Sequence, residues 1–130
     1  MIYLDSAAVV KLVHAEPGSQ ALREWLGERA EVGWTSSVFV EVETSRALMR
    51  YAPEAVVRLH PVLDLIDVVD LDARVRILAQ TVRPETVRSL DAVHLATALS
   101  IGSRLTTFVT YDKRLADAAR AAGLGVAAPA

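Results

Sequence analysis

Cysteine is absent from this 130-residue sequence, and aromatic residues make up only 5% of it. The absence of cysteine excludes disulfide bonds, thiolate zinc sites and cysteine nucleophiles, and it fits a reducing cytoplasm. With so few aromatic side chains, no surface for stacking the bases of a single-stranded nucleic acid is evident. We therefore interpret Trp25 and Trp34 as anchors of the hydrophobic core.

Long apolar runs and a basic net charge are also missing. Nowhere do about 18 uncharged apolar residues follow one another, and no basic segment precedes an apolar stretch, so we expect neither a membrane span nor a signal peptide. The formal net charge is −2, whereas proteins that rely on non-specific phosphate contacts are basic. Binding to nucleic acid would therefore need a local basic patch or a metal ion in an acidic site.

What the sequence does contain is an alternation of strand-like and helical segments. Hydrophobic residues make up 52% of the chain, and its length is typical of one domain spanning 1–130. The predicted strands are 2–4, 32–36, 66–69, 106–110 and a short 125–128. The predicted helices are 6–14, 19–29, 37–51 with Ser37 as N-cap, a helix from Pro53 broken near His60-Pro61, 72–82, 89–101 with Ser89 as cap, and 112–122.

This alternation predicts an α/β fold in which a central parallel sheet of four to five strands is flanked by helices on both faces. In such sheets, ligands bind beyond the carboxyl ends of the strands. Asp5 and Asp112 both lie there, each just before a helix. As an N-cap, each would stabilise its helix by about 1 kcal/mol, which is a sufficient explanation for either residue alone. Two such residues at strand ends nevertheless point into the same crevice.

Two further acids need an explanation. Asp91 lies in the first turn of a helix that is apolar almost all round, and a buried carboxylate needs a partner or a metal ion. The alternative is that Asp91 is placed there because a negative charge near the start of a helix is stabilised by the helix dipole. We favour binding of a metal ion. Glu43 is two residues from Glu41, so only one of the two can face the crevice. Periodicity does not decide between them.

Four segments of the chain together resemble PIN-domain proteins, specifically VapC-type toxins of bacterial toxin–antitoxin pairs. They are MIYLDSAAVVKL at 1–12, ETSRAL at 43–48, SLDAVHLATA at 89–98 and FVTYDKRL at 108–115. The resemblance covers nearly the whole chain. In the family, the acid precedes an Arg-Ala-Leu-like stretch by three residues and follows a Ser or Thr at the helix start by six. The resemblance therefore implies Glu43 rather than Glu41.

The resemblance implies a metal-dependent endoribonuclease that cuts single-stranded or loop RNA, in a tRNA or a ribosomal RNA. Its acidic site would comprise Asp5, Glu43, Asp91 and Asp112, with the hydroxyls of Ser6 and Thr110 positioning these acids or a water on the metal. Ligation by oxygen alone selects Mg²⁺ or Mn²⁺ over zinc. The implied partners are a cognate VapB-type antitoxin and a second copy of the chain in a homodimer.

Several alternatives stay open. His94 lies three residues after Asp91 and is interpreted as a packed residue with one hydrogen bond rather than as a metal ligand, and Asp117 is a reserve ligand. Five basic residues near Asp91 and Asp112 are either ordinary surface or phosphate contacts, namely Arg83, Arg88, Arg104, Lys113 and Arg114. An aspartate-based phosphotransfer domain with Asp70 as acceptor and an inactive PIN-fold binding module are the competing functions.

Overall fold

A sheet of five parallel strands in the order β3-β2-β1-β4-β5 runs through the centre of the computed structural model, which describes all 130 residues. The strands are β1 (Ile2–Leu4), β2 (Trp34–Ser37), β3 (Ile66–Val69), β4 (Thr107–Val109) and β5 (Val126–Ala127). All neighbouring strands are parallel, and every connection between successive strands contains a helix, as parallel pairing requires. The predicted α/β fold class is confirmed.

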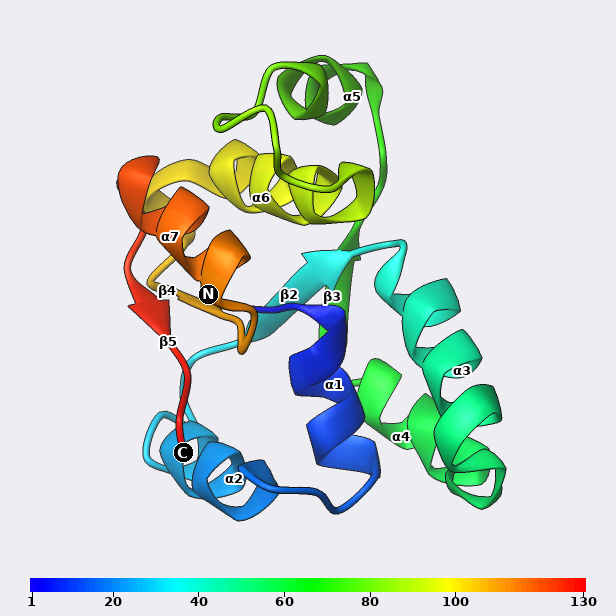
Figure 1. Cartoon of the computed structure of the whole chain (residues 1–130). Coiled ribbons are helices and arrows are strands. Elements are labelled where there is room, and N and C mark those ends of the chain that lie inside the picture. Colours follow the sequence, from blue (N-terminus) through cyan, green and yellow to red (C-terminus); the bar gives the residue numbers. More distant parts are fainter.

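The helices cover both faces of this sheet (Figure 1). They are α1 (Ser6–Val13), α2 (Ser19–Gly27), α3 (Val40–Tyr51), α4 (Leu59–Leu63), α5 (Ala73–Gln80), α6 (Ser89–Ile101) and α7 (Lys113–Ala121), with the 3₁₀ turns η1 (Pro53–Arg58) and η2 (Gly102–Arg104). Helices α6 and α7 lie on one face, and α1 to α4 lie on the other. None of these helices has both the length and the apolar composition needed to span a membrane.

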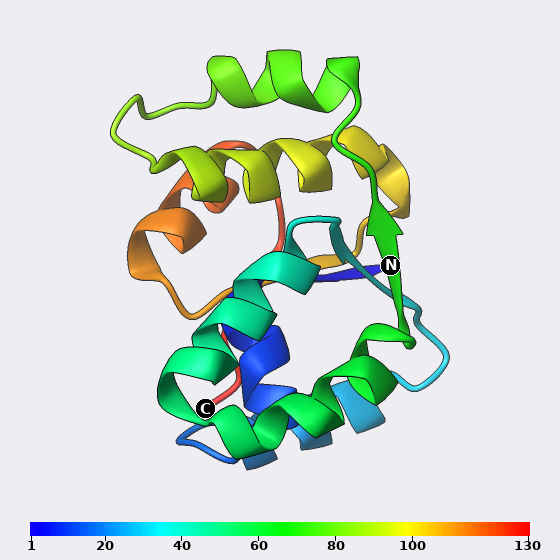
Figure 2. The same ribbon diagram turned by 90° about the vertical axis from the view of Figure 1, so that its right-hand side faces the viewer.

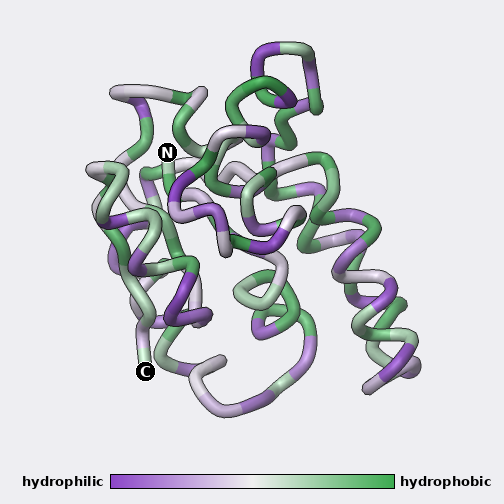
Figure 3. The backbone as a smooth tube through the Cα atoms, turned by 45° about the horizontal axis from the view of Figure 1, so that its top comes forward, coloured by the Kyte–Doolittle hydropathy of each residue, from purple (hydrophilic) through white to green (hydrophobic).

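Strand β1 divides the hydrophobic interior into two clusters, because successive side chains of a strand point to opposite faces. Ile2 and Leu4 belong to a cluster of 15 buried residues that α1 to α4 complete. Tyr3 belongs to a second cluster of 8 buried residues, formed with α6, α7 and Phe108. Hydrophobic and hydrophilic residues alternate along several helices of the backbone tube in Figure 3, as expected for helices that turn an apolar side to one of these clusters.

Helix α6 is the most enclosed helix of the fold. It packs against the sheet, and α5 lies along its outer side, as Figure 2 shows. Seven of its residues are buried, including Leu95 and His94. The prediction that this helix is buried is confirmed, and it places the first turn of α6, with Asp91, beside the sheet.

Two predicted helix caps and one predicted helix break are wrong. Ser37 ends β2 instead of capping a helix, and its hydroxyl accepts a hydrogen bond from the Phe39 N–H at 3.2 Å before α3 begins. His60-Pro61 does not break a helix. Pro61 falls in the first turn of α4, where its missing N–H would have no partner in any case. The N-cap residue of α6 is Arg88 rather than Ser89.

Candidate active site

Asp5 and Asp112 occupy the point where the strand order of the sheet reverses. From β1 the chain proceeds through β2 to β3 on one side of the sheet, and it then returns to add β4 and β5 on the other side of β1. Open parallel sheets bind ligands at such a reversal. Asp5 directly follows β1, and its N–H donates to the carbonyl of Val109 at the end of β4 at 3.2 Å. Asp112 follows β4 after a two-residue turn. The two acids therefore stand beyond the same pair of strand ends.

Both residues cap helices, as the simplest interpretation of the sequence predicts. Asp5 Oδ1 accepts from the Ala8 N–H and Asp112 Oδ1 from the Leu115 N–H, both at 2.9 Å. Asp72 follows β3 and caps α5 with the same geometry, at 2.9 Å from the Val75 nitrogen, and is exposed.

Capping therefore does not require a buried aspartate, yet Asp5 is only 5% exposed. Burial raises the pKa of Asp5, and the charge of Asp91 adds to this effect. Hydrogen bonds from Thr110 and from the Ala8 N–H, together with the charge of His94, oppose it without cancelling it. The capping role of Asp5 does not explain why its carboxylate is buried and has a raised pKa.

Asp91 brings a third carboxylate to this place from the first turn of α6. Partial burial raises its pKa, and the negative charge of Asp112 raises it further. His94 and Arg88 lower it, and Glu43 raises it. Asp91 thus lies within electrostatic range of all three other predicted site acids, and these like charges repel one another.

Glu43 faces the crevice from α3, whereas Glu41 is exposed. The Ser6 hydroxyl donates to Glu43 Oε1 at 2.8 Å, and His94 Nε2 lies 2.7 Å from the same oxygen. Partial burial acts to raise the pKa of Glu43, but the hydrogen bond and charge of His94 and the hydrogen bond of Ser6 outweigh it and leave the pKa lowered. Glu43 is therefore held as an ionised acceptor.

Three other residues named from the sequence are Thr110, Asp117 and Arg83. Thr110 is fully buried, and its hydroxyl accepts from the Asp112 N–H at 3.1 Å, which holds the turn between β4 and α7. Asp117 is exposed and pairs with Arg120 at 3.5 Å. Arg83 pairs with Glu85 at 3.5 Å on the surface.

The chemistry of the donors fits a hard divalent cation, although no three of the acidic and histidine side chains are gathered closely enough to enclose an ion in this conformation. The four predicted acids supply only oxygen atoms, and the raised pKa values of Asp5 and Asp91 reflect in part mutual repulsion. A cation between them would relieve it. The metal ligand set stays a prediction.

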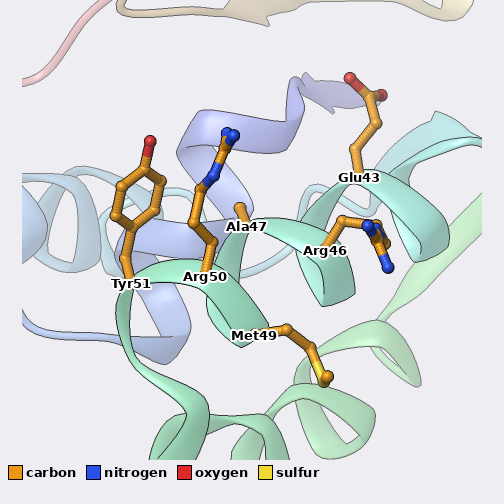
Figure 4. A pocket seen from close by; sticks show the side chains of 6 residues that line it. All are labelled: Glu43, Arg46, Ala47, Met49, Arg50 and Tyr51. Atoms are coloured by element: carbon orange, nitrogen blue, oxygen red, sulfur yellow. The ribbon is translucent and has the colours of Figure 1, made fainter.

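Basic residues border this acidic centre on two sides. A cavity of about 260 Å³ is lined by Asp91 and Asp112 together with Arg88, Lys113 and Arg114. On the other side, α3 carries a groove lined by Glu43, Arg46, Ala47, Met49, Arg50 and Tyr51. Figure 4 shows Glu43 and Arg50 extending from one side of α3 and Met49 from the other.

Nearly the whole chain matches known proteins. Residues 2–121 match the PIN domain. The chain is 46% identical to Ribonuclease VapC35 of Mycobacterium tuberculosis over 131 aligned residues, which cover 99% of this chain and 97% of that protein. This chain belongs to the VapC-type PIN-domain ribonucleases. Ribonuclease VapC47 of the same species is 42% identical over 99% of this chain and 97% of its own length.

Two solved structures share the PIN fold at low identity. The crystal structure of M. tuberculosis VapC20, described as a sarcin-ricin loop cleaving toxin, superposes with a TM-score of 0.76 at 17% identity over 95% of this chain and 96% of that one. FitAcB from Neisseria gonorrhoeae gives a TM-score of 0.71 at 19% identity over 97% and 96%. Membership of the VapC-type PIN ribonucleases argues against the phosphotransfer alternative, and Asp70 lies exposed after an edge strand rather than a central one.

Two residues of this PIN site have more contacts than the sequence suggests. His94 has three side-chain partners, so the expectation of one hydrogen bond is wrong: Tyr3 at 2.6 Å, Glu43 at 2.7 Å and Ser6 at 3.2 Å. Tyr3 is not among the site residues predicted from the sequence. The available signal was a tyrosine within a buried strand, because a buried phenol needs a partner for its hydroxyl.

Proposed function

We propose that this VapC-type ribonuclease is a metal-dependent endoribonuclease toxin whose Mg²⁺ or Mn²⁺ is held by Asp5, Glu43, Asp91 and Asp112. One observation carries the proposal: Asp5 is buried at the reversal point of the sheet and has a raised pKa, partly because of Asp91. Helix capping does not account for this, since Asp72 caps its helix while exposed. A cation accounts for both the burial and the crowding of negative charge.

The chain holds each of these acids in a way that suits such a role. Asp5 and Asp112 each use Oδ1 for a backbone N–H, which fixes the carboxylate and orients it. No hydrogen bond from the chain engages Asp91. When bound, Mg²⁺ or Mn²⁺ would neutralise charge on the phosphate and lower the pKa of an attacking water. Glu43, ionised and held by Ser6 and His94, is placed to accept a proton or orient that water.

The two groups of basic residues suggest how RNA lies on the protein. Its backbone would cross the acidic centre, with Arg88, Lys113 and Arg114 contacting phosphates on one side and Arg46 and Arg50 on the other. Such contacts supply affinity without reading sequence. Such local groups of basic residues would allow a chain with a net charge of −2 to bind RNA.

The substrate and partners are proposed by analogy with the relatives. VapC20 is described as cleaving the sarcin-ricin loop, and a loop in a ribosomal RNA or a tRNA is the substrate class we propose here. A VapB-type antitoxin would block the crevice, and the homodimer is retained as a further expectation.

Cleavage of total cellular RNA by the purified chain tests the proposal. Wild type, Asp91→Asn and Asp70→Asn are incubated with Mg²⁺, with Mn²⁺ and with EDTA, and the cleavage ends are sequenced. We expect discrete internal cuts by wild type and Asp70→Asn that require the metal, and none by Asp91→Asn. Cleavage by Asp91→Asn at the wild-type rate would show that the site is wrong. Absence of cleavage under every condition would instead favour an inactive binding module.

A further inference from the structure

The most connected polar side chain in the protein is a histidine that contacts neither the proposed metal nor the reacting groups. His94 lies on α6 one turn after Asp91 and is only 2% exposed. Its Nδ1 lies 2.6 Å from the Tyr3 hydroxyl, and its Nε2 lies 2.7 Å from Glu43 Oε1. The rings of Tyr3 and His94 meet edge to face, with centroids 5.7 Å apart. A continuous line of contacts thus runs from β1 through α6 to the crevice.

The direction of the hydrogen bonds along this line can be worked out. Glu43 is ionised and can only accept, so Nε2 carries a hydrogen and donates to it. When the imidazole is neutral, Nδ1 accepts from the Tyr3 hydroxyl; when the ring carries a proton on both nitrogens, Nδ1 donates to the phenol oxygen instead, and Nε2 donates to Glu43 in either state. Burial raises the pKa of Tyr3, which keeps this phenol protonated. The N–H of Ser37 donates to the same phenol oxygen at 3.0 Å and fixes it from β2.

The line of contacts ends on one particular oxygen of Glu43. His94 and the Ser6 hydroxyl both donate to Oε1, whereas no hydrogen bond from the chain engages Oε2. We infer that Tyr3 and His94 are positioning residues that fix the Glu43 carboxylate, with Oε1 held and Oε2 left for the reacting groups or the cation. This inference rests on the proposed nuclease function.

The same contacts argue against two simpler roles for His94. It is not arranged as a metal ligand, because both ring nitrogens already have partners within the chain. A histidine kept only to satisfy the buried Tyr3 hydroxyl would need Nδ1 alone. The contact of Nε2 with Glu43 is not needed for that role. A test must therefore distinguish the effect of losing the Nε2–Glu43 contact from the effect of losing the Nδ1–Tyr3 contact.

Replacing His94 by asparagine or by glutamine distinguishes the two contacts. The amide of His94→Asn ends near the position of Nδ1 and keeps a partner for Tyr3, whereas the longer amide of His94→Gln reaches the position of Nε2 and keeps a donor for Glu43. Mn²⁺ affinity is measured without RNA from the electron paramagnetic resonance signal of the free ion. kcat and KM for RNA and the melting temperature complete the set, and His60→Asn, on the surface, is the matched control.

For His94→Asn we expect Mn²⁺ affinity and kcat to fall by about tenfold or more, as for other residues that orient a metal-site ligand. KM should change little, since the line of contacts does not reach the basic residues. His94→Gln should retain clearly more of both quantities than His94→Asn, and His60→Asn should match wild type. Equal losses in folded His94→Asn and His94→Gln, or a greater loss in the glutamine variant, would overturn the inference.

Two further variants keep the test decisive. If His94→Asn does not fold, Tyr3→Phe removes the phenol oxygen that contacts Nδ1 and the Ser37 N–H and keeps the ring in the core; unchanged Mn²⁺ affinity and kcat in that variant would overturn the inference. Asp91→Asn is measured in parallel. If wild type cleaves RNA, Asp91→Asn does not and the His94 variants match wild type, the positioning role fails while the nuclease function stands. If Asp91→Asn also cleaves as wild type does, the nuclease site itself is wrong.

Discussion

Replacing Asp91 by asparagine is expected to stabilise the protein without metal and to weaken its response to Mn²⁺. The pKa of Asp91 is raised because the side chain is partly buried and lies near the charge of Asp112. Its ionised form therefore costs free energy at pH 7, where an asparagine of nearly the same size carries no charge. Because solvent screens a partly exposed group, relief of this repulsion is worth of the order of 0.5 kcal/mol.

The response to Mn²⁺ is the larger quantity. A ligand at about 100 times its dissociation constant stabilises the native state by about 2.7 kcal/mol. With about 2.1 cal/mol/K of unfolding entropy per residue, a chain of 130 residues shifts its melting temperature by about 4 °C per kcal/mol. Wild type should therefore gain about 10 °C, whereas Asp91→Asn, with about tenfold weaker affinity, should gain about 5 °C at the same concentration.

Thermal unfolding at pH 7 in EDTA and in Mn²⁺ measures both effects. Asp70→Asn is the matched control, because Asp70 also follows a strand but is exposed outside the crevice, and it should behave as wild type in both conditions. The reasoning is refuted if Asp91→Asn melts below wild type in EDTA and gains as many degrees from Mn²⁺ as wild type does.

Three other outcomes follow from the same structure. The stability advantage of Asp91→Asn in EDTA should disappear as the pH falls below about 4, since the raised pKa means that Asp91 is then protonated when folded and gains no charge on unfolding; an advantage that persists in acid unfolding scans would contradict this. In the Asp91→Asn background, Arg114→Ala should weaken RNA binding and reduce the slope of log affinity against log salt by about 1, and an unchanged slope would place Arg114 off the RNA path. Leu95→Ala should cost about 2–5 kcal/mol in urea unfolding, because Leu95 is 1% exposed between α6 and the sheet, whereas Leu65→Ala on the surface should cost under about 0.5 kcal/mol.

Local chemistry explains why much of the fold can be predicted from the sequence. Asp5 and Asp112 follow apolar strands and cap helices through backbone groups three residues later, an interaction that sequence neighbours determine by themselves. Ser37 shows the limit of this reasoning. It has the composition of a helix cap, but pairing between β2 and β3 extends through Ser37, and the helix begins only at Val40.

The part of the site that could not be predicted depends on contacts between distant segments. Tyr3, Glu43 and His94 come from β1, α3 and α6, and they meet because α6 packs across the sheet on the face to which Tyr3 points. No spacing in the sequence reports this meeting. The resemblance to the family favoured Glu43 over Glu41 for the crevice, but it did not indicate that a buried histidine and tyrosine stand behind that carboxylate.

Three aspartates in this chain follow a strand and cap a helix, and they show what turns a structural residue into a candidate catalytic one. Asp5, Asp72 and Asp112 each stand between a strand and a helix and cap that helix at the same distance of 2.9 Å. Asp72 stands at the outer edge of the sheet, after β3, and is exposed. Asp5 stands where the strand order reverses, with Asp91 of α6 within electrostatic range. The capping interaction positions each carboxylate, and sheet topology alone decides which of these carboxylates are brought together.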